Sequence, residues 1–428
     1  MVVGLGYGDE GKGSVVDYLA RQTKTSLVVR YNGGAQAAHN VVTPEGGHHT
    51  FAQFGSGSFV PGSATYLSRY MLVNPLNLYT EGKHLIELGV PEVWGRLFID
   101  MDAIIITPWH VAANRARERA RGDARHGSCG QGIGETRADA LAGTRLRAKD
   151  LLSSPEDLKT QLKNIRDYKD AQLHAELGHG LPSQGSEADE EEYLNRVVSL
   201  YMALPETVHV VGDDEVETLF EGPEQIIFEG AQGVLLDQDY GWHPHTTWSK
   251  TTLHNAEQLM LDYGCTGDVV TRWGVTRAYA TRHGAGPLPT ENSQTGGVEA
   301  HNNNDKWQGP FRIGGFDAIT FDYALAAQPV DKLALTCVDQ VGIGGQYVCC
   351  GYQIGGVTVK RVQFWEETTL ERQQEVTNML YNAVPEYVIF EGLEQFINWI
   401  DAIVPIGLTS MGPTADEKLA YEQRMLVQ

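Results

Sequence analysis

The chain has 428 residues, of which 33 are Lys or Arg and 55 are Asp or Glu, so its formal net charge is −22. The apolar fraction of 42% is enough for a large buried core and excludes disorder of the whole chain. The acidic balance excludes a protein that holds nucleic acid through clustered cations, but a small phosphorylated ligand needs only a few local donors. Glycine occurs 48 times without a Gly-X-Y period, which predicts turns and close-approach loops rather than collagen.

The chain contains no run of about 18 apolar residues, so no membrane-spanning helix is expected. Its first residues, MVVGLGYGDEGKG, lack a basic region followed by an apolar stretch, so no secretory signal is expected either. The five cysteines are odd in number and form no CxxC pair. We therefore expect reduced thiols in a cytoplasmic protein that binds neither a membrane nor nucleic acid.

Apolar runs that end in glycine turns alternate with helical patterns along the chain. The runs at 1–5 and 27–31 predict strands, and Val15, Val16 and Leu19 share one face of a helix predicted over 14–21. Further strands are expected at 97–106, 226–229, 333–338 and 402–408, and further helices at 109–121, 256–263 and 368–380. Strands that alternate with helices predict a mainly parallel sheet with helices on both faces.

We expect one large P-loop-like α/β domain over residues 1–428, because no repeat and no Pro-, Gly- or Ser-rich linker divides the chain. Its phosphate loop would lie near 4–13, and inserted subdomains would include an insertion near 150–220. The most polar window, SQGSEADEEE at 183–192, predicts a solvated insertion or the start of a helix.

A glycine-rich loop, GYGDEGKG at 6–13, directly follows the first strand and precedes the first helix. Its backbone N–H groups, the helix N-terminus and Lys12 suit a phosphate cradle. The spacing G-x4-G-K is that of a P-loop, but Gly13 replaces the Ser or Thr that usually holds magnesium. Asp9 is therefore the candidate metal ligand or base.

Other small-residue loops also follow predicted strands. RYNGGAQAAHN at 30–40 leaves Gln36 and His39 as its functional side chains, and FEGAQGVLLD at 228–237 carries Gln232, whose amide can pair with the edge of a purine. TRHGAGPLPTE at 281–291 is a stiff loop suited to lining a pocket, and SMGP stands at 410–413. Asp339 follows the strand at 333–338, and its carboxylate can accept both N1–H and N2–H of guanine, which adenine cannot offer.

In this order and combination, GDEGKG, EGAQGVLLD, TRHGAGPLPTE and SMGP resemble the motifs of the adenylosuccinate synthetase family over nearly the whole chain. The resemblance implies a homodimeric, GTP-dependent ligase with one Mg²⁺ per site. Such an enzyme phosphorylates the 6-oxygen of a purine nucleotide monophosphate, here IMP, and displaces the phosphate with an amine. Aspartate is the default amine, and the products are then adenylosuccinate, GDP and phosphate.

The resemblance also implies roles for single residues. Asp9 takes the purine N1 proton and holds Mg²⁺ together with the carbonyl of Ala38. His39 stabilises the transferring phosphoryl group and donates a proton, with Lys12 and Gln232 as the other catalytic side chains. GTP contacts are implied at Gly8, Glu10, Gly11, Lys12, Gly13, Asp339, Ser410, Met411 and Gly412. Purine nucleotide contacts are implied at Asp9, Gln36, His39, Ser128, Cys129, Gln232, Thr247 and, from the partner of a dimer, Arg145.

One stretch departs from the family. The family has a TTGRxRR-like loop whose arginines clamp aspartate. This chain has DKWQGPFR at 305–312 in its place. Lys306 and Trp307 replace the two threonines, Gly309 replaces the principal arginine, and Arg312 is retained. Three explanations stay open: the amine is not aspartate, Lys306 and Arg312 do the clamping, or the nucleotide is a guanylate.

A non-catalytic GTP-binding regulator is the alternative of another class. Retention of both Asp9 and His39 argues against it, and Gly13 argues against an ordinary P-loop kinase or GTPase. The net charge of −22 further predicts that the binding site is a local positive island in an acidic surface. The cations expected to form this island are Lys12, Arg145, Arg282 and Arg312.

Overall fold

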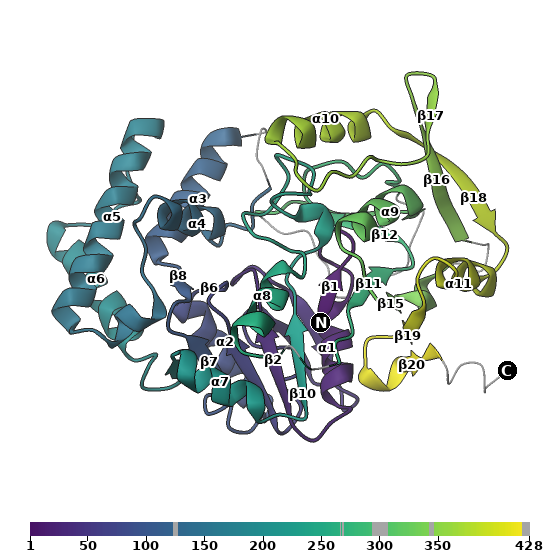
Figure 1. The fold of residues 1–428 in the computed structure, drawn as a ribbon. Coiled ribbons are helices and arrows are strands. Elements are labelled where there is room, and N and C mark those ends of the chain that lie inside the picture. The colour runs from purple at the N-terminus through teal and green to yellow at the C-terminus, as the bar shows by residue number, and fades with distance from the viewer. Residues whose placement is uncertain (123–126, 266, 268, 293–306, 342–345, 422–428) are drawn as a thin grey trace.

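The computed structural model describes residues 1–122, 127–265, 267, 269–292, 307–341 and 346–421. Within them, a ten-stranded sheet runs through the centre of the molecule, and its strands are parallel except for the last pair, β19 and β20 (Figure 1). Its strands, in the order in which they lie side by side, are β20 (Lys418–Ala420), β19 (Ile406–Ser410), β15 (Lys332–Thr336), β11 (Trp273–Arg277), β1 (Val2–Gly4), β10 (Gln225–Glu229), β2 (Ser26–Arg30), β5 (Ser63–Leu67), β7 (Leu97–Asp100) and β9 (His209–Val211).

Helices cover both faces of this sheet, as the alternating pattern predicts. On one face, Val2 of β1 packs in a core with Val15 and Val16 of α1. On the other face, the next residue, Val3, belongs to a larger core that includes Leu259 of α8. The helices of the described residues are α1 (Lys12–Ala20), α2 (Pro75–Glu87), α3 (Pro108–Arg121), α4 (Ile133–Leu141), α5 (Pro155–Leu177), α6 (Glu187–Met202), α7 (Asp213–Glu221), α8 (His254–Asp262), α9 (Ala318–Ala327), α10 (Leu370–Tyr381) and α11 (Leu393–Asp401).

Smaller strand pairs flank the central sheet and carry loops to its edge. They are β3 (His39–Val42) with β4 (His48–Phe51), β6 (Leu72–Val73) with β8 (Ile104–Ile105), β12 (Ala280–His283) with β13 (Phe311–Gly314), and the group of β14 (Phe316–Asp317), β16 (Gln346–Ile354), β17 (Val357–Val359) and β18 (Val384–Phe390). In the β12–β13 pair, Arg282 stands opposite Arg312 and His283 opposite Phe311. Among the described helices, none is long and apolar enough to cross a bilayer.

Two predicted strands are wrong in extent. The run 97–106 is broken into β7 and β8, because the Asp100 carboxylate accepts the amide of Asp102 at 2.8 Å and turns the chain. The run 402–408 becomes a strand only at Ile406, after Pro405 and the end of α11. The other predicted strands and helices are confirmed within a few residues.

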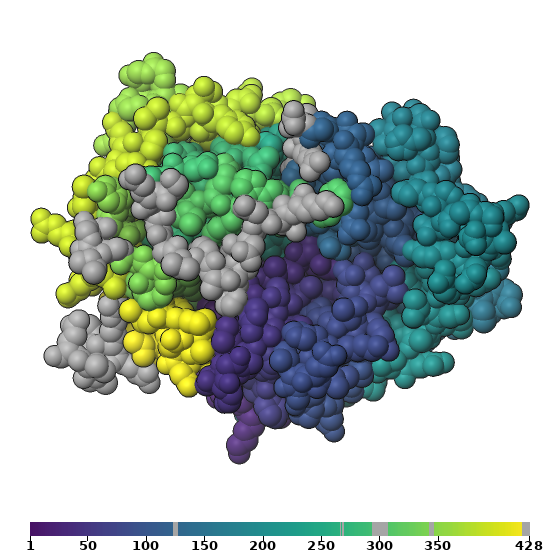
Figure 2. Space-filling view, turned by 180° about the vertical axis from the view of Figure 1, so that it is seen from behind, coloured from purple at the N-terminus to yellow at the C-terminus, as the bar shows by residue number. Residues whose placement is uncertain are grey.

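The stretch near 150–220 folds into α5, α6, β9 and α7. Helices α5 and α6 lie together at one end of the molecule, whereas β9 joins the edge of the central sheet (Figure 1). Helix α6 starts inside the polar window, where Ser186 accepts the amide of Asp189 as an N-cap. On the opposite face of the molecule, Figure 2 shows the C-terminal residues, in yellow, directly against the N-terminal residues, in purple. The segments that follow β1 and β19 therefore meet at one place.

Candidate active site

The glycine-rich loop between β1 and α1 is braced from within by an ion pair. The ammonium of Lys12 donates to Glu10 Oε2 at 2.8 Å and to the carbonyl of Gly8 at 2.9 Å. The other oxygen of Glu10 accepts the amide of Gly8 at 2.7 Å. Both side chains are buried, so Glu10 supports the loop and holds Lys12, the lysine expected to bind phosphate, in place.

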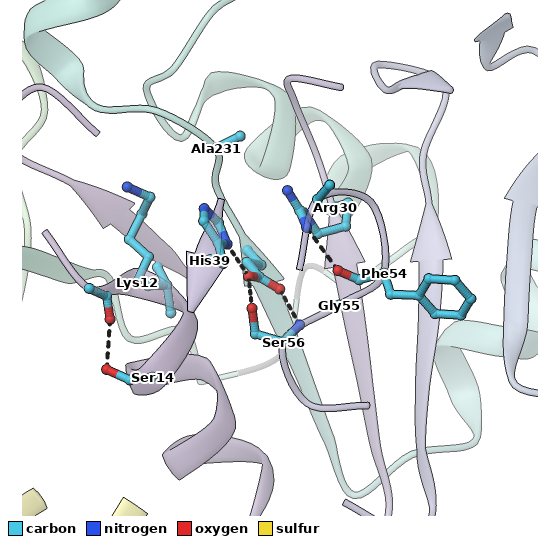
Figure 3. Close-up of polar contacts among 12 residues, drawn as sticks. Lys12, Ser14, Arg30, His39, Phe54, Gly55, Ser56 and Ala231 are labelled. Atoms are coloured by element: carbon cyan, nitrogen blue, oxygen red, sulfur yellow. Dashed lines mark hydrogen bonds and ion pairs between the residues drawn. The ribbon is translucent and has the colours of Figure 1, made fainter. Parts of the chain in front are cut away.

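His39, at the start of β3, is fixed by the buried carboxylate of Glu229 at the end of β10. Its Nδ1 lies 2.5 Å from Glu229 Oε1, and the amide and hydroxyl of Ser56 donate to the same carboxylate at 2.9 and 2.5 Å. Figure 3 shows His39 between Lys12 and Ser56, with Arg30 beyond. The sequence analysis did not single out Glu229, because the sequence does not show which side chains a carboxylate at a strand end will contact.

The charges in this group are set by burial and by one another. Burial alone would raise the pKa of Glu229, but Arg30, His39 and Ser56 lower it to about 2. Burial lowers the pKa of His39 in spite of the opposing effect of Glu229. At neutral pH the free protein therefore holds an ionised Glu229 that accepts Nδ1–H from a neutral imidazole, which leaves Nε2 for a ligand.

The structure explains the glycine at position 13, where a P-loop has Ser or Thr. A Cβ on Gly13 would lie 2.7 Å from the Cβ of His39 and 3.0 Å from Ser56 Oγ. No side chain fits there while His39 takes this place. The loop thus resembles a P-loop only in the spacing of its glycines and lysine. His39 lies over the first turn of α1, where a P-loop has the hydroxyl of its Ser or Thr.

A cavity of about 260 Å³ opens beside this loop and joins it to the C-terminal segment. Its lining brings together residues that the sequence analysis assigned to GTP and to the metal: Gly8, Asp9, Gly11, Lys12, Gly13, Ala38, His39, Asp339, Ser410 and Gly412. Two of the expected GTP contacts lie elsewhere. Glu10 is buried under the loop, and the amide of Met411 donates to the carbonyl of Glu417.

Lys418 of β20, which the sequence analysis did not single out, lies behind the turn that carries Gly412 and Pro413 of this cavity. Its ammonium donates to the carbonyls of Gly412, Pro413 and Thr414, at 3.4, 3.3 and 2.8 Å, and so shapes the turn after β19. Burial lowers its pKa to about 8, although Asp17, Glu417, Cys337 and Asp339 raise it. The chain thus has a cation near Cys337, where the family usually has a lysine.

A second cavity, of about 500 Å³, lies beside the loops that carry Gln36, Gln232 and His283. It is lined by the residues expected around the purine nucleotide, Gln36, Ser128, Cys129, Gln232 and Thr247. Gln232 adopts a left-handed φ of 58°, and its Oε1 has no hydrogen-bond partner among the described residues. The same holds for both polar atoms of the Gln36 side chain. Buried, unpartnered amides at a cavity favour a bound polar ligand.

Asp9 and His283 connect the two cavities. Asp9 lines the smaller cavity and His283 the larger, and His283 Nδ1 lies 3.0 Å from Asp9 Oδ2. Arg277 adds a hydrogen bond from Nε to the carbonyl of Asp9 at 2.5 Å. Burial alone would raise the pKa of Asp9, but the hydrogen bond from His283 and the charges of His283, Arg277 and Lys12 lower it.

The expected positive island is largely neutralised by local partners. Arg282 is buried and donates to the carbonyls of Ala285, Pro287 and His245, so it supports the loop rather than offering a free charge. Arg312 is paired with Glu291 at 2.9 Å. Only Arg145 of the expected cations is exposed without a partner in the described part of the chain, and it lines neither cavity.

The stretch expected to hold the amine substrate is described only in part. Lys306 lies outside the described residues. Trp307 lies between the guanidinium groups of Arg115 and Arg119, at 5.3 and 5.2 Å, and close to Gly130. Gly309 has a φ of +98°, in the left-handed region, and a Cβ at this position would lie 3.4 Å from the Cα of Gly284. Aromatic packing against α3 thus anchors this stretch where the family has a threonine.

The oxygen atoms at the smaller cavity suit Mg²⁺. Asp9 offers a carboxylate and Ala38 a carbonyl, both hard ligands, and Lys12 lines the same cavity. No group of three or more His, Cys, Asp or Glu in the described residues could hold a metal by itself. This fits Mg²⁺, which commonly takes one or two protein carboxylates and completes its coordination with water and phosphate oxygens.

A mainly parallel α/β sheet with a glycine-rich loop at a helix N-terminus, and with a cavity on each side of the Asp9–His283 contact, is typical of enzymes that bind and transfer phosphoryl groups. The sequence pattern of the adenylosuccinate synthetase family matches residues 1–417, so the chain belongs to this family. Its members are GTP-dependent ligases of purine biosynthesis that join aspartate to IMP with Mg²⁺. The chain is accordingly a ligase that forms carbon–nitrogen bonds.

Curated relatives of similar length carry the name of the same family. The adenylosuccinate synthetase of Alteromonas mediterranea is 32% identical over 443 residues, which cover 98% of this chain and 97% of the relative. That of Acaryochloris marina is 32% identical over 446 residues, with 99% and 94% covered.

Two solved structures share the fold. Fully ligated adenylosuccinate synthetase of Plasmodium falciparum has a TM-score of 0.79 at 20% identity and 98% coverage of both chains. Succinoaminodeoxyadenylate synthetase of cyanophage S-2L, bound to dGMP and dATP, has a TM-score of 0.56 at 19% identity, covering 98% of this chain and 94% of that one.

The low pKa of Glu229 predicts a contribution to acid stability. Because the pKa is about 2 in the folded chain against 4.5 in the unfolded chain, the stabilisation is present above about pH 4.5 and lost as pH falls toward 2. Urea unfolding of wild type and of Glu229→Gln should show stability differences that shrink by on the order of 3 kcal/mol over this range. Parallel curves would contradict the assignment. Glu206→Gln, at an exposed position, is the control and should follow wild type.

Proposed function

We propose that this chain joins aspartate to IMP in two steps within one site, with its residues in the roles set out below. The observation that carries the proposal is the position of Asp9, which lines the smaller cavity beside Lys12 and His39 and reaches the larger cavity through His283. A base in this position can take a proton from a nucleotide in the larger cavity while GTP lies in the smaller one. A protein that only binds GTP does not need such a base.

In the first step, the ionised Asp9 takes the N1 proton of the purine, and the 6-oxygen attacks the γ-phosphorus of GTP. The lowered pKa of Asp9 keeps it deprotonated and ready at neutral pH. Lys12 and the loop amides hold the phosphates, and Gln232 holds the base. The rate comes mainly from positioning and charge neutralisation, as in phosphoryl transfer generally.

The imidazole ring of His39 is held in a fixed orientation toward the γ-phosphoryl group that is transferred. Glu229 accepts its Nδ1–H, so Nε2 is the atom directed at the phosphoryl oxygens. The negative charge that GTP brings into the cavity favours the imidazolium, which the ionised Glu229 also stabilises, so Nε2 takes up a proton from solvent as the nucleotide binds. His39 can then donate this proton from Nε2 to the phosphoryl oxygens.

Mg²⁺ would be held by Asp9 and the carbonyl of Ala38, where it neutralises phosphate charge. At the other end of GTP, the carboxylate of Asp339 is suited to N1–H and N2–H of guanine, beside Ser410 and Gly412. In the second step the amine displaces the 6-phosphoryl group. Arg312 is the described cation within the stretch expected to hold the carboxylates of the amine substrate. To bind a substrate carboxylate, it must give up its ion pair with Glu291.

We further propose a homodimer in which Arg145 reaches the nucleotide 5′-phosphate of the partner. The residues expected around the 5′-phosphate, Gln36, Ser128, Cys129 and Thr247, are uncharged, and Arg145 is exposed outside both cavities. Residues 1–428 would act as one catalytic unit in each protomer. The five free cysteines support a cytoplasmic location for it.

The function is tested by turnover with a panel of nucleotides. Purified protein with GTP and Mg²⁺ should release phosphate with IMP plus aspartate and give a product of the mass of adenylosuccinate, whereas Asp9→Asn should lower kcat by about 10²- to 10⁴-fold. GMP and dGMP are the competing nucleotides. Phosphate release with either of them but not with IMP, or from the Asp9→Asn variant at the wild-type rate, would contradict the proposal.

The shared arginine is tested by mixing two inactive variants. Asp9→Asn lacks the base, and Arg145→Leu lacks the cation supplied to the partner. After unfolding and refolding together, hybrid dimers contain one intact site, so the mixture should recover about a quarter of wild-type activity, because half of the dimers are hybrids. Recovery should be absent when the variants are refolded separately. An active Arg145→Leu variant alone would remove Arg145 from the role.

A further inference from the structure

His283 is a second ionisable side chain at the base, and the reaction as set out above gives it no task. It ends β12, within the TRHGAGPLPTE stretch, and its side chain is 16% exposed. Its Nδ1 lies 3.0 Å from Oδ2 of Asp9, whose side chain is 19% exposed. Two partly accessible groups from loops more than 270 residues apart in sequence thus form one polar pair.

The ring of His283 is held from the side by the stretch that departs from the family. His283 stands opposite Phe311 in the β12–β13 pair, and the two ring centroids are 4.7 Å apart. The next residue, Gly284, donates its amide to the carbonyl of Pro310 at 2.9 Å. Phe311 also lies 5.8 Å from the guanidinium of Arg277, which binds the backbone of Asp9.

The pair lies at the boundary of the two cavities. Asp9 lines the cavity of about 260 Å³, and His283 lines the cavity of about 500 Å³ together with Gln232. A carboxylate in an open loop can rotate, and only one rotation presents an oxygen to the purine. A hydrogen bond to one oxygen restricts that rotation and leaves the other oxygen to act.

We propose that His283 is a positioning residue of the phosphoryl-transfer step: its Nδ1–H donates to Oδ2 of Asp9 and fixes the carboxylate, so that Oδ1 takes the N1 proton of the purine. Phe311 in turn holds the imidazole. The rebuilt stretch at 307–312 therefore supports the base of the first step as well as facing the amine of the second. This inference rests on the proposed function.

The experiment isolates the first step. GTP labelled with ¹⁸O in the β,γ-bridge is incubated with IMP and Mg²⁺ but without aspartate, and migration of the label to the β-nonbridging position reports reversible phosphoryl transfer. Exchange by wild type confirms the step itself. Its absence overturns the proposed function, whereas an unaffected variant overturns only the role of His283.

Two variants with amide side chains distinguish the roles of the two ring nitrogens. His283→Asn places a donor at the Nδ1 position, and His283→Gln places it at Nε2. His283→Gln should slow the exchange by about 10- to 100-fold, the effect of losing a hydrogen bond to a charged group. IMP and GTP affinities from equilibrium titration should change by less than about twofold, since a carboxylate that is only misoriented still leaves the binding contacts intact. His283→Asn should recover most of the lost rate.

His254→Gln, at an exposed position of α8, is the matched control and should exchange like wild type. His283→Leu is the second loss variant, used if the glutamine variant unfolds, with thermal unfolding as the check. Wild-type exchange in His283→Gln or His283→Leu would overturn the proposal. So would an asparagine variant that is as slow as the glutamine variant at unchanged affinities.

Discussion

The buried carboxylate of Glu229 is the interaction on which the site depends. A buried charge is tolerated only when partners compensate it, and here Arg30, His39 and Ser56 do so together. The carboxylate thereby ties the end of β10 to the chain segments that follow β2. With the ring of His39 fixed in this way, no side chain can stand at Gly13, and the phosphate loop closes against it. One carboxylate thus fixes both the position of the His39 ring and the shape of the glycine-rich loop.

Charge pairing within the chain determines how nucleotides can bind. The cations near the cavities are held by local acceptors, as Lys12 is by Glu10 and Arg312 by Glu291. A phosphate or carboxylate that enters must compete with these acceptors for the same cations. An acidic chain can therefore keep cations at its active site without exposing a positive patch to nucleic acid. Backbone amides of the glycine loop supply donors that no internal carboxylate neutralises.

The sequence was sufficient for the sheet, the helices and the loops at the strand ends, because hydrophobic periodicity and glycine turns are local signals. Only the resemblance to the family implied that these loops belong to one site. The sequence could not predict that His283 would face Asp9, because the approach of residues 274 positions apart depends on packing of the whole chain. Nor could it predict that Arg282, which does line the larger cavity, would be held by the carbonyls of Ala285 and Pro287. The roles of Asp9, His39 and Gln232 remain predictions that their positions support.

The central claim is that the purine 6-oxygen attacks GTP and leaves with the phosphate. The most direct measurement uses IMP labelled with ¹⁸O at the 6-position, with GTP, Mg²⁺ and aspartate, and determines by mass spectrometry where the label appears. Since the attacking oxygen becomes part of the 6-phosphoryl group, the account predicts one ¹⁸O in each phosphate released as the amine is added. Unlabelled phosphate formed together with an aminated product would show that water, not the purine, received the phosphoryl group, and would contradict the account.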